Sequence, residues 1–394
     1  MKKFAKKTVV SLLMICVLCL NLCSCGTNDA STEQAEETAM PQTDAFKEKE
    51  VSLEAKEESE SSLPFKAADH YECVRTDTTI HDSGLVYTEV VDDMIYVFIQ
   101  QYDTEKNRGY YEYCTYDMLE EEWTEPEVCS WSENLSKLGT GQQQFHRDSD
   151  GSWYCSVHAD LETERDYLCK LNNDGSVEKV VLPEEAWAEE KDGRILNYDF
   201  IGDGKVMILL VKPGDAYSPD VVYKTCLMNI RTKEYELVEI SKDIDIPFVI
   251  GDEFFCTSYT EESCGFAVWK KGSEQPVREM KCEFFLTDSE RSTPFFKFPQ
   301  SCQDEGDNLY IMYDDGIYGG YYKDKKLKTI LNENMAPFME LSDNGDNKAP
   351  MISSFCRGTD TKYADFYALI ANGDMSAAHL EFDYELAHIR AARE

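Results

Sequence analysis

Short apolar and aromatic stretches alternate with polar turns from about residue 66 to residue 383. An acidic or glycine-containing turn is repeatedly followed by a strand that opens with large apolar residues. The openings lie 48 to 58 residues apart when these positions are taken as equivalent: Ile95, Trp153, Val206, Phe254 and Leu309. Repeats of several strands at spacings near this length are typical of a β-propeller.

A second signal accompanies the first, because each opening strand is followed by further apolar strands joined through tight polar turns. Tyr167–Leu171 and Val177–Leu182 flank the turn Asn173-Asp-Gly175 and are predicted to form a β-hairpin. Asp-Gly and Asn-Gly turns between such strands are the strongest local hairpin signal. Comparable turns bring the predicted hairpins to six, near Glu121, Thr232, Gly272 and Asp324 and at Asn372-Gly373.

These patterns predict an all-β domain over residues 66–383, a β-propeller of about six blades within a range of five to seven. The last repeat lacks the Gly-Asp opening, and Pro350–Phe355 is expected to be its inner strand. A seven-bladed propeller is the second alternative and a pair of β-sandwiches the third. Radial packing of small sheets explains how so many residues form one domain with only short exposed edges.

The first 25 residues carry an export signal. Four lysines precede an apolar stretch from Val9 to Leu22, which is too short to span a bilayer. The stretch ends in Leu22-Cys23-Ser24-Cys25, an order that resembles the bacterial lipobox. We therefore predict a lipoprotein signal peptide over residues 1–24 and lipidation of Cys25. Cys23 fits less well because Leu22 would then occupy a position that needs a small residue, and an ordinary secretory signal is the alternative.

Lipidation would place the protein on the outer face of the cell membrane. Several acyl chains such as palmitate on one residue give durable anchoring, whereas a single chain binds reversibly. Residues 25–65 then form a tether, since residues 26–65 hold eleven acidic residues, three lysines and few large apolar side chains. A segment of this composition cannot bury enough apolar surface to offset the entropy of ordering, so we expect the tether to be disordered.

The chain as a whole carries a formal net charge of −37. A charge of this sign repels phosphate backbones, so nucleic acid is excluded as a partner. The partners expected are the membrane, through the lipid anchor, and either a carbohydrate or a transporter or other surface protein. The propeller itself is expected to be monomeric.

The cysteines give no metal or disulfide pattern. Eleven lie between Cys73 and Cys356 without a C-x-x-C pair, and several fall within apolar stretches. We interpret them as buried free thiols that act as small apolar side chains, in an anaerobic habitat where exported thiols survive. Linear spacing shows no cluster of metal ligands among the six histidines and these cysteines. No cofactor and no metal are predicted.

No motif that carries catalysis is found, and no catalytic residue is predicted. Asp148-Ser-Asp150-Gly151-Ser-Trp153 resembles the Asp-box of sialidase-like propellers only loosely, because Asp150 and Gly151 are adjacent and the motif occurs once. A hairpin turn that leads into a strand is the favoured interpretation. The candidates for ligand contact are three tyrosines among glycines, Tyr318, Tyr321 and Tyr322. A strand with close backbone contacts explains the same pattern.

The order of segments resembles the amino-terminal part of large clostridial surface lipoproteins. In that family a lipobox and an acidic tether precede a propeller-like region, and a solute-binding domain of an ABC transporter follows. The closing Ile389-Arg-Ala-Ala-Arg-Glu394 resembles the start of the first helix of that domain. We therefore expect residues 384–394 to begin a C-terminal helix that is truncated here.

Two functions from different classes fit these observations. The leading hypothesis is a non-catalytic, lipid-anchored binding or scaffold module at the cell surface, associated with carbohydrate uptake of the ABC type, and not an enzyme. The alternatives are a glycan-active propeller enzyme, either a hydrolase or a lyase, and a truncated fragment of a larger solute-binding lipoprotein.

Overall fold

The computed structural model describes most of the chain from residue 63 onward. Residues 1–62 lie outside the described residues, so the signal peptide, Cys25 and most of the tether stay predictions. The described ranges are 63–66, 68–78, 80, 86–103, 108–138, 141–158, 166–184, 194–202, 204–211, 222–241, 248–259, 263–270, 273, 275–283, 300–313, 316–332, 335, 348–374 and 382–392.

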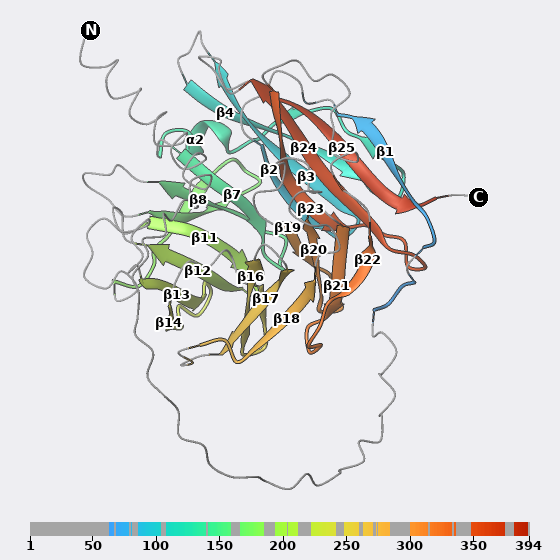
Figure 1. Cartoon of the computed structure of the whole chain (residues 1–394). Helices are drawn as coiled ribbons and strands as arrows, with labels where there is room; N and C mark the ends of the chain where they lie inside the picture. Colours follow the sequence, from blue (N-terminus) through green and yellow to red (C-terminus); the bar gives the residue numbers. More distant parts are fainter. Residues whose placement is uncertain are drawn as a thin grey trace, which may run out of the picture. The chain divides into compact units, whose positions relative to one another are not determined.

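Six antiparallel sheets follow one another around a common centre (Figure 1), which confirms a six-bladed β-propeller. We number the sheets as blades 1 to 6 in chain order. Blade 1 holds β2 (Val86–Val91), β3 (Met94–Asp103), β4 (Arg108–Asp117), β5 (Glu122–Trp123) and β6 (Glu127–Val128). Blade 2 holds β7 (Gly141–Arg147), β8 (Trp153–His158), β9 (Tyr167–Leu171) and β10 (Val177–Val180). Blade 3 holds β11 (Arg194–Phe200), β12 (Lys205–Val211), β13 (Val222–Asn229) and β14 (Tyr235–Ser241).

The remaining blades repeat this four-stranded order. Blade 4 holds β15 (Phe248–Ile250), β16 (Glu253–Tyr259), β17 (Ser263–Lys270) and β18 (Arg278–Glu283). Blade 5 holds β19 (Gln300–Gln303), β20 (Asn308–Tyr313), β21 (Gly316–Tyr321) and β22 (Lys328–Leu331). Blade 6 holds β23 (Lys348–Arg357), β24 (Asp365–Asp374), β25 (Phe382–Ala391) and β1 (Tyr71–Asp77).

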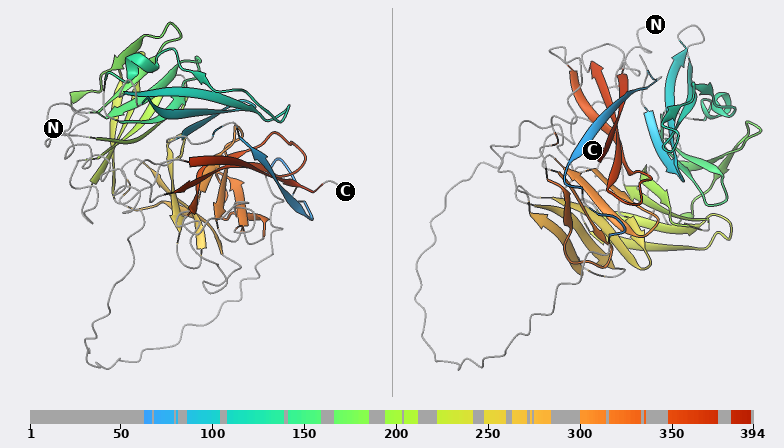
Figure 2. Two further views of the ribbon diagram at one scale, coloured as in Figure 1. Left: turned by 90° about the horizontal axis from the view of Figure 1, so that it is seen from above. Right: turned by 90° about the vertical axis from the view of Figure 1, so that its right-hand side faces the viewer.

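Blade 6 joins the two ends of the domain. Strand β1 pairs antiparallel with β25, from Tyr71 opposite Ala391 to Asp77 opposite Glu385. Figures 1 and 2 show the blue β1 beside the red β25. The first strand of the domain therefore completes the last blade, which closes the ring by hydrogen bonds between strands more than 300 residues apart.

The C-terminal helix predicted for residues 384–394 is wrong, because residues 382–391 form the strand β25. The segment is rich in helix formers, but β25 pairs with β24 on one side and with β1 on the other. Its buried side chains include Leu386 and Ile389, at 1% and 0% exposure. Tertiary pairing and burial outweigh intrinsic helix propensity here, as they commonly do. Ile389, Arg390 and Ala391, which open the segment that resembles a solute-binding domain, thus lie in a strand of the propeller.

Two predictions concern the neighbouring strands. Pro350–Phe355 lies within the inner strand β23, as expected. The turn predicted at Asn372-Gly373 is wrong, because both residues are paired inside β24. Strand β24 extends to Asp374 since it has a partner along both edges, which satisfies the backbone hydrogen bonds of residues that would otherwise favour a turn.

The recurring acidic or glycine turns connect the first and second strands of successive blades. Several turn residues have positive φ angles, including Asp92 (53°), Gly151 (85°), Gly204 (72°) and Asp307 (59°). Glycine reaches this region without steric cost, and Asp reaches it more easily than most residues. Because first strands of a propeller run in the same direction along the axis, these turns lie on one face, which we call the turn face.

Apolar side chains fill the space between neighbouring blades. The cluster between blades 1 and 2 contains Phe98, Tyr111 and Phe145, and the cluster between blades 6 and 1 contains Ile95 and Leu386. Each blade thus buries both faces against its neighbours, which makes the interfaces between blades the core of the domain. In the described part of the chain, the one α-helix is α2 (Ser132–Leu135), and no helix there has the length and apolar character needed to cross a membrane.

Candidate functional site

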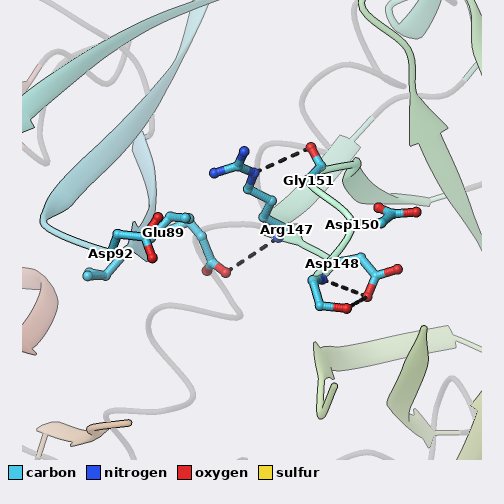
Figure 3. Close-up of a pocket in the computed structure, with 9 residues that line it drawn as sticks. Glu89, Asp92, Arg147, Asp148, Asp150 and Gly151 are labelled. Carbon is cyan, nitrogen blue, oxygen red and sulfur yellow. Dashed lines mark hydrogen bonds between the residues drawn. The ribbon is translucent and has the colours of Figure 1, made fainter. Parts of the chain in front are cut away.

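A cleft of about 470 Å³ opens between blades 1 and 2 at the turn face. One side comes from β2 and the turn after it, and the other from the end of β7 and the turn before β8. Figure 3 shows acidic side chains on both sides, with Arg147 between them. The lining residues are Glu89, Val90, Val91, Asp92, Arg147, Asp148, Ser149, Asp150 and Gly151.

Asp148 fixes the wall of the cleft to blade 3. Its side chain is buried, and its carboxylate accepts hydrogen bonds from the backbone N–H groups of Ser149 (2.7 Å) and Gly204 (3.1 Å). The Arg231 guanidinium donates to the other carboxylate oxygen at 2.8 Å. Gly204 has a φ of 72°, and a Cβ there would lie 2.8 Å from the Arg231 Nε. A side chain at this position would strain the backbone and displace the Arg231 side chain, so glycine suits the place where the two blades meet.

The side chain of Arg147 packs against the far end of the same turn, next to Gly151 and Trp153. Its Nε donates to the Gly151 carbonyl oxygen at 3.3 Å, and its guanidinium lies 5.8 Å from the centre of the Trp153 ring. Its backbone N–H donates to Glu89 Oε1 at 3.4 Å, which ties the two walls of the cleft together. A guanidinium and several carboxylates thus face one solvent-accessible space, where they can donate to and accept from a polar ligand.

Below the cleft, three titratable side chains from the first strands of blades 1, 2 and 3 meet. His146 Nδ1 lies 2.9 Å from Glu89 Oε2 and 3.7 Å from Asp199 Oδ1. Burial lowers the pKa of His146, but the charge and hydrogen bond of Glu89 and the charge of Asp199 outweigh it and raise that pKa to about 9. The imidazole is therefore a cation between two carboxyl groups at neutral pH.

Asp199 differs from its partners in its access to solvent. Burial raises the pKa of Asp199 to about 6, although the positive charge of His146 opposes this shift. Nevertheless 41% of its side-chain surface is accessible, against 17% for His146. In a fraction of the molecules the Asp199 carboxyl group is thus protonated near neutral pH. A protonated carboxyl group can donate a hydrogen bond as well as accept one.

Two buried polar atoms lie on the same strand, β7. His146 Nε2 and Gln144 Oε1 have no hydrogen-bond partner among the described residues. Gln144 is the extra residue of a β-bulge between Gln143 and Phe145, with a φ of 58°. Bulges re-aim side chains and are common beside functional sites. Buried polar groups of this kind usually have a partner, so Gln144 Oε1 can accept a hydrogen bond from water or a polar ligand, and the protonated His146 Nε2 can donate one.

The ion-pair cluster predicts a specific pH dependence of stability. The folded chain holds the His146 proton up to about pH 9, whereas an unfolded chain releases it near 6.5. The stabilisation is complete below pH 6.5 and is lost as the pH rises through 9. Between these values the free energy of unfolding should fall by up to about 3 kcal/mol more in the wild type than in His146→Gln. Urea unfolding at a series of pH values measures this, and equal slopes for the two proteins would contradict it.

The three tyrosines proposed as ligand contacts do not line this cleft. Tyr318 is 1% exposed on β21 in blade 5, so its ring belongs to the core. Tyr321 and Tyr322 stay half-buried with their rings 4.7 Å apart. A Cβ at Gly319 would lie 2.7 Å from side-chain atoms of Tyr310 and Ile330, so close packing explains the glycine at this position. A ligand role for Tyr321 and Tyr322 stays a prediction.

One sequence motif marks the cleft, the acidic turn Asp148–Trp153. The Asp148–Trp153 motif does form the hairpin turn between β7 and β8, as predicted. Its carboxylates also line the cleft and bind the next blade. Glu89, His146 and Asp199 carried no motif, and only the packing of the inner strands brings them together. Among the described residues, no three His, Cys, Asp or Glu side chains are placed to hold a metal ion.

Comparison with known proteins finds propellers of distant sequence. No protein-family model and no curated protein sequence matches the chain. A subtype N11 neuraminidase-like protein of A/flat-faced bat/Peru (H18N11) is 9% identical with a TM-score of 0.44, covering 84% of this chain and 97% of its own. The β-propeller domain of the Trilobed protease from Pyrococcus furiosus is 9% identical with a TM-score of 0.37, covering 79% and 84%.

The solved structures that resemble this chain correct one prediction. They include the catalytic domain of the Coprinopsis cinerea GH62 α-L-arabinofuranosidase, which is 11% identical with a TM-score of 0.37, covering 79% of this chain and 93% of its own. They also include acylaminoacyl peptidases and a polysaccharide lyase. The prediction that this chain is not an enzyme is contradicted by these neighbours. At this identity they show the fold and identify no activity.

Proposed function

We propose that the chain is a lipid-anchored protein of the outer cell surface whose propeller binds a glycan at the cleft between blades 1 and 2. The observation that carries the proposal is the cleft, in which carboxylates and one guanidinium from two blades face a volume of about 470 Å³. Small-ligand sites commonly have volumes of this order. The anchor rests on the predicted signal peptide and on Cys25, as in the clostridial lipoproteins that the chain resembles.

The chemistry of the cleft suits sugars, especially those that carry an amine. Asp92 and Asp150 can accept hydrogen bonds from hydroxyl or ammonium groups, and Arg147 can donate to ring or hydroxyl oxygens. The net charge of −37 attracts cations toward the surface, which favours amine-bearing glycans over acidic ones. Binding of this kind would fit a role in carbohydrate uptake by an ABC-type transporter.

Glycan hydrolysis is the second candidate function, and the Asp199 site favours it. A carboxyl group with a pKa of about 6 that reaches solvent has the properties of a general acid. Carboxyl groups with shifted pKa values that reach solvent are found more often at catalytic sites than elsewhere, and this is the reason to test Asp199.

Calorimetric titration of the full chain with glucosamine oligomers and N-acetylglucosamine oligomers tests the binding proposal. We expect the double variant Asp92→Asn, Asp150→Asn to bind at least about tenfold more weakly, because hydrogen bonds to charged groups are lost. Asp252→Asn is the matched control, since this exposed aspartate occupies the corresponding turn of blade 4. No saturable binding, or equal loss in the control, would contradict the proposal.

Two further experiments test the remaining parts of the proposal. Release of reducing ends that is lost in Asp199→Asn, while binding is kept, would assign hydrolysis. Metabolic labelling with a fatty-acid probe should mark the wild type and leave Cys25→Ala unmarked. An unlabelled wild type would refute the anchor without affecting the cleft.

A further inference from the structure

Cys264 and Cys282 face each other across two paired strands of blade 4. They lie directly opposite in the antiparallel ladder between β17 and β18, and their Sγ atoms are 3.5 Å apart. Opposite residues of an antiparallel pair have Cα atoms about 4.5–5.5 Å apart, which lies inside the range that disulfides accept. A small rotation of the side chains is thus enough to join the two sulfur atoms.

The backbones approach closely beside this pair. A Cβ at Gly265 would lie 1.8 Å from the Met280 carbonyl oxygen, so only glycine fits next to Cys264. Strand β18 is the last strand of its blade, and Cys282 near its end is 7% exposed, whereas Cys264 is 1% exposed. Outer strands open locally at lower free energy than core strands, so Cys282 is the thiol that a solute reaches first.

A second pair in the same molecule provides an internal comparison. Cys155 and Cys169 are also directly opposite, on β8 and β9 of blade 2, and both are 0% exposed. Burial, reinforced by the neighbouring Cys169, raises the pKa of the Cys155 thiol well above its ordinary value. The thiolate is the reacting form in disulfide exchange, so this interior pair should react slowly while the chain stays folded.

We propose that Cys264 and Cys282 form a redox modification site that small-molecule disulfides convert into a cross-strand disulfide. The Cys282 thiolate attacks one sulfur of glutathione disulfide, which forms a mixed disulfide and expels one glutathione. The Cys264 thiolate then attacks Cys282 Sγ and expels the second glutathione. One glutathione disulfide is reduced to two glutathiones, which take up the two thiol protons, and the protein pair is oxidised.

The disulfide would link β18, the outer strand of blade 4, covalently to β17. The two cysteines are separated by 18 positions, so the bond restricts the unfolded chain and the oxidised protein should unfold at a higher temperature. The inference is independent of the proposed glycan site, which lies between blades 1 and 2.

Treating the folded full chain with glutathione disulfide, then mapping peptides without reduction, tests the site. We expect a peptide pair linked through Cys264 and Cys282 to appear well before any link between Cys155 and Cys169. The wild type should release two glutathiones for each of these links formed. This part of the test needs no variant. An interior link that forms first, or no link at Cys264, would overturn the proposal.

Variants test the order of attack. Cys264→Ala should release one glutathione instead of two and keep a mixed disulfide on Cys282, whereas Cys282→Ala should leave Cys264 unmodified. Cys226→Ala is the control, because Cys226 is also buried, on β13, and has no facing thiol in its ladder. Glutathione trapped on Cys264 in Cys282→Ala at the wild-type rate would refute Cys282 as the entry point.

Discussion

Asp148→Asn should lower the free energy of unfolding by about 2 kcal/mol or more, because the buried carboxylate accepts charge-assisted hydrogen bonds that a neutral amide cannot all replace. The side chain of Asp148 is fully buried, and the groups around it are donors: two backbone N–H groups and the Arg231 guanidinium. An amide at this position keeps one acceptor oxygen and directs its NH₂ group toward these donors, which leaves Arg231 with the more distant Asp150 carboxylate at 3.4 Å. The loss falls on the interface between blades 2 and 3.

Asp150→Asn is the matched control for this prediction. Asp150 lies in the same turn and 3.4 Å from the same Arg231, but its side chain is 39% exposed. The amide can still accept the hydrogen bond from the Ser152 backbone N–H. Exposed ion pairs contribute between about 0 and 1 kcal/mol, so this variant should stay close to the wild type. Urea unfolding at pH 7 measures both, and similar losses in the two variants would refute the clamp assigned to Asp148.

Leu386→Ala should cost about 3 kcal/mol of stability, because it leaves a cavity in the blade that closes the ring. Leu386 is 1% exposed on β25, and its side chain packs in the cluster between blades 6 and 1. The same residue in a short, undocked helix would lie at the surface, where truncation changes little. The variant therefore separates the strand found here from the helix that residue types alone suggest.

Leu119→Ala provides the same chemical change at an exposed site. Leu119 lies in the turn between β4 and β5 with 64% of its surface accessible. Substitutions at such positions usually change stability by less than about 0.5 kcal/mol. Thermal and urea unfolding of the two variants should differ clearly. A Leu386→Ala protein as stable as Leu119→Ala would contradict the closure of blade 6 by β25.

The strand repeats were readable because they depend on short-range chemistry. Turns such as Asn173-Asp-Gly175 need residues that tolerate positive φ angles, and the apolar positions after them need burial. Both requirements act within a few residues. The turns and strands can therefore be recognised from one sequence, and counting them gives the correct number of blades.

The C-terminal strand could not be recognised in this way. Residues 384–391 combine good helix formers with apolar positions that suit either a helix or a buried strand. What decides between them is β1, more than 300 residues away, which pairs with β25 along its outer edge. Pairing with the neighbouring strands β23 and β25 extends β24 through Asn372-Gly373 and overrides a local turn signal.

The candidate site also combines features that local sequence predicts with features that only tertiary packing creates. The sequence alone determined the acidic turns, the small residues that shape them and the propeller class, whereas the export signal and the anchor at Cys25 stay predictions. Only the tertiary structure decided that Glu89, His146 and Asp199 meet and that Asp148 reaches into the next blade. The reason is physical: backbone preferences are local, whereas packing of inner strands joins residues some 50 positions apart through burial and charge.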